Sequence, residues 1–99
     1  MIVLEEKLAT VPTLFVEKRD GRRVVFDVDK IDKALHKAAE KVMDVTPLVE
    51  KRLNGLVERI VTEIHSRFPK GVKIYEIQNI VEHELLEAKE YALAEEYIT

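Results

Sequence analysis

The sequence predicts an α+β fold in which a small sheet of two or three strands packs with four helices. An Asp20-Gly21 pair separates two short runs of β-branched and aromatic residues, which indicates a β-hairpin. After the hairpin, the spacing of apolar residues changes to the 3.6-residue period of a helix. A short apolar run at 72–74, between two helical patterns, predicts one further strand.

Size and composition are those of a single-domain globular protein. The 99 residues are enough for one hydrophobic core, and 46% of them are hydrophobic and 35% charged. No apolar run approaches the roughly 20 residues that a membrane helix needs, and no signal-peptide pattern opens the chain. Cysteine is absent, which excludes disulfides and thiolate metal sites. We therefore expect a cytoplasmic protein without a membrane partner.

The chain is expected to divide into an N-terminal extension, residues 1–12, and one folded domain, residues 13–99. The extension is ambiguous, because Ile2–Leu4 could form an edge strand or belong to a tail before Pro12. No internal repeat and no low-complexity segment is visible.

The hairpin occupies the stretch VEKRDGRRVVFD, residues 16–27. Asp-Gly is typical of a two-residue hairpin loop, in which both loop residues take a positive φ. This loop predicts that Val16 pairs with Val25 and that Lys18 pairs with Arg23, so these four side chains share one face of the sheet. The other face would carry Phe15, Glu17, Arg19, Arg22, Val24 and Phe26. Since both faces are apolar at their base, helices should cover one, and a partner or a ligand the other.

Four helices follow from the apolar periodicity. Asp27 is a good N-cap for the first, and Thr46-Pro47 places a cap and a favoured first residue at the start of the second. The second helix contains Gly55, which costs on the order of 1 kcal/mol and could bend it. The expected apolar stripes are Ile31 to Val42, Val49 to Phe68, Ile77 to Ala88, and a last segment from Tyr91 to Ile98.

Catalytic and metal-binding patterns are absent from the sequence. The three histidines lie far apart without ligand spacing, and no Ser/His/Asp arrangement has a recognisable motif around it. Three glycines do not form a phosphate-binding loop. We therefore predict no catalytic residue and no protein metal site.

The hairpin tip is the candidate binding site. Four of the six residues from Lys18 to Arg23 are basic, and Lys30 stands in the first turn of the next helix, where a cation opposes the helix dipole. Residues 1–60 carry 12 Lys/Arg against 11 Asp/Glu, whereas residues 61–99 carry 4 against 8. An anion should therefore choose the first half of the chain. The alternative is a plain solvated turn.

Three ordered blocks of sequence resemble the ATP-cone domain. They are VEKRDG followed by Phe26-Asp27, Lys30-Ile31 and Ala34-Leu35; VKIYEIQ (72–78) followed by Val81-Glu82; and AEEYI (94–98). They cover roughly residues 13–99 in the order and spacing of that family.

The resemblance implies an allosteric domain that binds ATP or dATP, with Mg²⁺, and controls the overall activity of a ribonucleotide reductase, most of all the anaerobic class. It implies that the nucleotide contacts Val16, Lys18, Arg19 and Lys30. It also implies that the stretch from Ile74 to Gln78 lies beside the base. The lysines and the arginine would take phosphates, and Val16 the base or sugar. A polar residue is common where this chain has Val24, so no contact is carried over there.

The implied partners are adenine nucleotides and a catalytic domain of the same polypeptide, with possible oligomerisation through the cone and no DNA. The domain itself would not be an enzyme. Two alternatives stay open: a helical protein-interaction module that uses the basic hairpin, and the ATP-cone of a transcriptional repressor of reductase genes.

Overall fold

The computed structural model describes residues 14–98, so the expected extension, residues 1–12, and its Ile2–Leu4 run lie outside the described residues. The elements in chain order are β1 (Phe15–Glu17), β2 (Arg23–Val25), α2 (Val28–Val42), α3 (Pro47–Arg67), β3 (Gly71–Lys73), α4 (Ile74–Glu87) and α5 (Tyr91–Ile98). Among residues 14–98 this is the predicted α+β fold, with four helices and a three-stranded sheet. Within the described residues, no helix is both long and apolar enough to cross a membrane.

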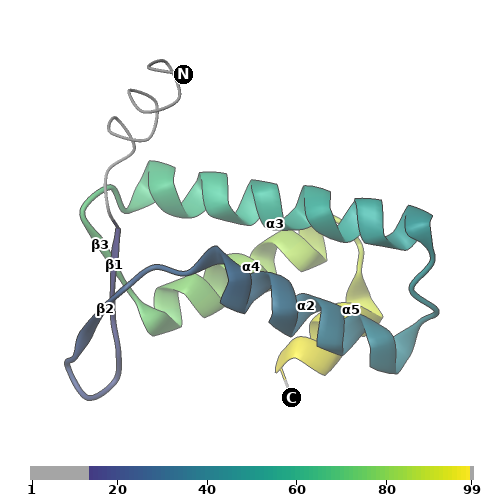
Figure 1. Ribbon diagram of the computed structural model, residues 1–99, viewed down its shortest axis with the longest axis horizontal. Coiled ribbons are helices and arrows are strands. Elements are labelled where there is room, and N and C mark those ends of the chain that lie inside the picture. Colours follow the sequence, from purple (N-terminus) through teal and green to yellow (C-terminus); the bar gives the residue numbers. More distant parts are fainter. Residues whose placement is uncertain (1–13, 99) are drawn as a thin grey trace, which may run out of the picture.

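The sheet occupies one end of the molecule, and the helices extend away from it (Figure 1). Helix α2 packs against α3 and α5, and α4 packs against the same two helices. The apolar stripes of all four helices meet in one core, whose most deeply buried large side chains are Leu35, Leu53, Ile60, Ile64, Val81, Leu85 and Leu93.

Strand β1 is the centre of the sheet, whose order is β2-β1-β3. It pairs antiparallel with β2 and parallel with β3. A parallel neighbour requires a crossover connection, and here α2 and α3 supply it. The side chain of Val16 therefore has Val24 as its partner on one side and Val72 on the other.

The predicted two-residue hairpin loop is wrong by one residue. The Lys18 N–H donates to the Arg22 carbonyl (2.8 Å), and the Gly21 N–H donates to the Lys18 carbonyl (2.9 Å), so the loop has three residues, Arg19 to Gly21. Gly21 takes the positive φ (88°), whereas Asp20 does not. Its carboxylate instead accepts the Arg22 N–H (3.0 Å), a local turn that the two-residue pattern does not allow for.

The longer loop places each β2 side chain on the opposite face of the sheet from the one predicted. Val24, not Val25, lies opposite Val16. Val24 is half-buried against the core, whereas Val25 is 61% exposed. A shift of one residue moves every side chain of a strand to the other face. The inner face of the hairpin therefore carries Leu14, Val16, Lys18, Val24 and Phe26, and the opposite side of the hairpin carries Phe15, Glu17, Arg23 and Val25.

A second correction concerns Ile74. The predicted strand at 72–74 lies at 71–73, and Ile74 is the first residue of α4. The Glu76 carboxylate accepts the Lys73 N–H (2.9 Å), which satisfies a backbone donor at the helix start. This bond lets the chain change from strand to helix without a connecting loop.

The predicted starts of the first two helices, α2 and α3, are confirmed. The Asp27 carboxylate accepts the Asp29 N–H (3.0 Å), and the Thr46 hydroxyl accepts the Val49 N–H (3.2 Å). Helix α3 continues through Gly55 without interruption.

The two glycines at 55 and 21 provide a matched pair of stability tests. A methyl group added at either position would meet no atom within 4 Å, but only Gly21 has a positive φ. Gly55→Ala should therefore raise the free energy of unfolding by about 0.5–1 kcal/mol, because alanine is the better helix former. Gly21→Ala should lower it by about 1 kcal/mol, because the left-handed region strains an alanine. Thermal unfolding followed by circular dichroism measures both; shifts of the same sign would contradict the backbone assignment of the hairpin loop.

The hairpin loop also predicts a pH effect. The Arg22 backbone N–H, and after it the Arg22 side chain (Nε to Oδ2, 2.7 Å), hold the pKa of Asp20 below its ordinary 3.8. Because the pKa is lowered, this contact stabilises the hairpin fully at pH values above the ordinary pKa of an aspartate. The stabilisation is lost as the pH falls through the lowered pKa. In an NMR titration of the carboxyl carbon, Arg22→Ala should move the pKa only part of the way back, because the backbone donor remains. Arg19→Ala removes the same charge without a bond to Asp20 and is the control.

Candidate functional site

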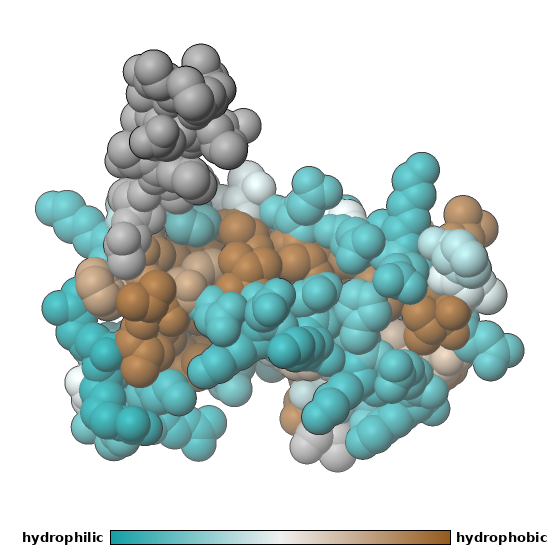
Figure 2. All heavy atoms as spheres, in the orientation of Figure 1, coloured by the Kyte–Doolittle hydropathy of each residue, from teal (hydrophilic) through white to brown (hydrophobic). Residues whose placement is uncertain are grey.

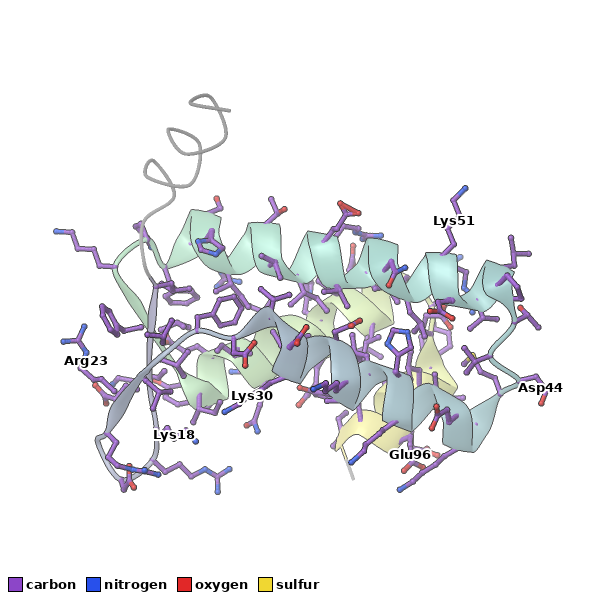
Figure 3. The ribbon with its side chains drawn as sticks, in the orientation of Figure 1. Lys18, Arg23, Lys30, Asp44, Lys51 and Glu96 are labelled. Atoms are coloured by element: carbon purple, nitrogen blue, oxygen red, sulfur yellow. The ribbon has the colours of Figure 1, made fainter. Side chains whose placement is uncertain are left out.

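A pocket of about 170 Å³ lies between the inner face of the hairpin, the start of α2, the start of α4 and the end of α5. Its lining residues are Val16, Lys18, Val24, Val25, Phe26, Asp27, Lys30, Ile31, Ile74, Ile77, Gln78 and Tyr97. Figure 3 shows Lys18 on the hairpin and Lys30 on α2 on two sides of the space between these elements.

The walls of the pocket are mainly apolar. Val16 is only 5% exposed, and Ile31 and Ile77 are also buried, so these three side chains are held by the core. Phe26 is half-buried, and its ring meets the ring of His65 edge to face, with 5.8 Å between the centroids. A flat apolar group could contact these walls without displacing the core.

The polar groups come from four different elements. Lys18 lies two residues after Val16 and so on the same face of the hairpin, where it is half-buried. Lys30 is exposed in the first turn of α2, beside the cap residue Asp27. Gln78 on α4 and Tyr97 on α5 complete the set. Two cations at the edge of an apolar pocket, next to a helix N-terminus, are suited to a ligand with an apolar part and an anionic part.

Five of the six predicted contact residues line this pocket: Val16, Lys18, Lys30, Ile74 and Gln78. The sixth, Arg19, does not. It is the first residue of the hairpin loop and is exposed. Its predicted contact stays a prediction.

Sequence reasoning missed several lining residues. Val24 carries no predicted contact because a polar residue is common at its position in the family, and the two-residue loop also places it on the other face of the hairpin. Tyr97 comes from the last helix, and no local pattern connects this residue with the hairpin. Burial, and after it the charge of Glu82, raises the pKa of the Tyr97 hydroxyl, so this group is a neutral hydrogen-bonding group at neutral pH.

No metal-binding cluster accompanies the pocket. Among residues 14–98, no three His, Asp or Glu side chains lie close enough together to hold a metal ion. His36 and His65 are half-buried and His83 is exposed.

Comparisons with known proteins agree with the resemblance in the sequence. Residues 14–99 match the family described as the ATP cone domain. The chain is 37% identical over 93 residues to the ribonucleoside-diphosphate reductase subunit alpha of Chlamydia muridarum and 38% identical over 93 residues to that of Chlamydia trachomatis; each match covers 87% of this chain. It is also 36% identical over 87 residues to the transcriptional repressor NrdR of a Synechococcus strain, a match that covers 88% of this chain.

The chain spans 9% of the length of the two reductase subunits and 51% of the length of the repressor. The family match covers all the described elements, including the hairpin, the start of α2 and the last helix, which together form the pocket. The chain belongs to the ATP-cone domain family.

Proposed function

We propose that this domain binds ATP and dATP in the pocket between the hairpin and α2, and that it thereby regulates the overall activity of a ribonucleotide reductase. One observation supports this most directly: two lysines from different elements, Lys18 and Lys30, both line a mainly apolar pocket in an ATP-cone domain. A nucleotide has the matching two parts, an apolar base and an anionic phosphate chain.

The lining residues suggest how the ligand would lie. The phosphates would contact Lys18 and Lys30, near the positive end of the α2 helix dipole, with Mg²⁺ neutralising part of their charge. The base would lie against Val16 and the start of α4, where Ile74 contributes apolar surface and Gln78 an amide. Arg19 on the adjacent loop would reach the outermost phosphate.

The sugar would lie near apolar side chains. ATP and dATP differ by one hydroxyl, and a site built to hydrogen-bond that hydroxyl would reject dATP. The walls formed by Val16, Val24 and Ile31 carry no hydrogen-bonding group, so they suit a pocket that accepts both nucleotides. In this proposal ATP permits activity and dATP prevents it, through a change in how the cone assembles with other subunits.

The attribution to a reductase rests on the two alpha subunits, in which the matched segment is a small part of a much longer chain. Both are named ribonucleoside-diphosphate reductases, and the anaerobic class stays a prediction. The match to NrdR supports a second candidate, a nucleotide-sensing domain of a transcriptional repressor. A catalytic domain in the same polypeptide would identify the protein as a reductase and not a repressor.

Nucleotide binding is the first test of the proposal. Isothermal titration calorimetry should detect binding of both ATP and dATP, and either ligand at 100 times its dissociation constant should stabilise the domain by roughly 2.7 kcal/mol. For a domain of this size, the melting temperature should rise by several degrees. Inorganic phosphate is the control for a simple anion effect. No heat and no shift with millimolar ATP or dATP would overturn the nucleotide proposal in favour of an interaction module.

The phosphate contacts can be tested one residue at a time. Lys18→Ala should weaken ATP binding by about 10- to 100-fold, because a charge-assisted hydrogen bond contributes roughly 1.5–3 kcal/mol. Lys30→Ala should have a similar effect, and Arg19→Ala a smaller one. The control is Lys51→Ala, which removes the same charge from an exposed side chain of α3 (Figure 3). An equal loss in Lys51→Ala and Lys18→Ala would mean that net charge alone determines affinity.

A further inference from the structure

The side of the sheet that faces away from the pocket forms a second concave surface. We call it the outer face, and its lining residues are Phe15, Glu17, Arg23, Phe68, Lys70, Gly71, Val72, Lys73 and Glu76. They surround a shallow depression of about 580 Å³. Alternation along β1 separates it from the pocket, because Val16 points inward whereas Phe15 and Glu17 line the outer face.

The base of the outer face is aromatic, and an arginine lies against each ring. The Arg23 guanidinium is 4.7 Å from the centroid of Phe15, and the Arg67 guanidinium is 5.6 Å from that of Phe68. Both rings are half-buried. Figure 2 shows apolar and hydrophilic side chains side by side at this end of the molecule. The rings hold the guanidinium groups in place next to apolar surface.

The cations of the outer face are available to a partner. Within residues 14–98, Arg23, Lys70 and Lys73 form no ion pair with a carboxylate within 4.0 Å. Of the two acidic side chains, Glu76 already accepts the Lys73 N–H and is half-buried. The other, Glu17, is the exposed cross-strand neighbour of Arg23 and Lys73 and forms no ion pair with either of them within 4.0 Å. Arg23 points away from the helices (Figure 3). Unpaired cations beside apolar surface favour an anionic partner with an apolar side chain.

The distribution of charge over the molecule limits the size of that partner. The sheet end, residues 14–25 and 67–76, carries 7 Lys/Arg against 3 Asp/Glu. The rest of the described chain, residues 26–66 and 77–98, carries 8 against 14. A long polyanion such as a nucleic acid would extend from the basic end over an acidic body and be repelled there. A short acidic segment would meet only the basic end.

We propose that the outer face binds a short acidic peptide segment of a partner protein, with an aromatic residue of that segment against Phe15 and Phe68 and its carboxylates on Arg23, Lys70 and Lys73. Acidic segments with an aromatic anchor satisfy both the charge and the apolar surface of the depression. The binding does not depend on a nucleotide, because the pocket lies on the other side of β1.

The test uses the full chain and a defined probe. The probe is a fluorescein-labelled peptide of about 12 residues with six carboxylates around one phenylalanine, and fluorescence anisotropy measures its affinity at low and physiological salt. We expect saturable binding that weakens with salt, at least tenfold weaker binding to Arg23→Glu and Lys70→Glu, and no change with Lys51→Glu. Lys18→Ala should leave peptide binding within about twofold of the unchanged chain. A peptide with amides in place of the carboxylates should not bind.

Other results would overturn the proposal. One is equal affinity of the acidic peptide for all variants. Another is no peptide binding by the unchanged chain when its melting temperature shows that it is folded. A third is a single-stranded oligonucleotide of equal charge that binds more tightly than the peptide. Self-association that Arg23→Glu abolishes in sedimentation would identify a second copy as the occupant instead. Binding that occurs only after removal of residues 1–13 would assign the face to the chain's own N-terminal segment. Because two separate charge reversals are compared, a variant that fails to fold does not decide the outcome.

Discussion

The pairing of β1 with both of its neighbours is the constraint on which the rest of the structure depends. The strand has only three residues, yet it is antiparallel to β2 and parallel to β3, so it fixes segments more than 40 residues apart in the sequence. The parallel pairing requires the chain to leave the sheet through α2 and α3 and return beside β1. That return places the start of α4, and with it Ile74 and Gln78, beside the hairpin.

The register of the hairpin determines the chemistry of both faces. With Gly21 in the left-handed region and Asp20 bonded to Arg22, the loop has three residues, and Val24 joins Val16 and Lys18 on the inner face. In the alternative register, Val24 would point outward and Arg23 inward. The apolar wall of the pocket and the arginine of the outer face are therefore two consequences of one loop conformation.

The two faces of the sheet have different partners in our interpretation, although they share β1. The inner face is closed by the helical core and leaves a pocket with two lysines at its edge. Among the described elements, only the end of α3 and the start of α4 border the outer face, which presents three cations without carboxylate partners in that part of the chain.

The sequence by itself determined the fold class, the helix starts at Asp27 and Thr46, the last helix, and five of the six proposed contact residues that line the pocket. These depend on local signals, namely apolar period, capping residues and an ordered family motif. Only the tertiary structure decided the hairpin register, the place of Tyr97 in the pocket wall, and the gathering of Lys70 and Lys73 beside Arg23. A loop of two or three residues differs by hydrogen bonds within the turn, and contacts between distant segments depend on how the core packs, which no local pattern contains.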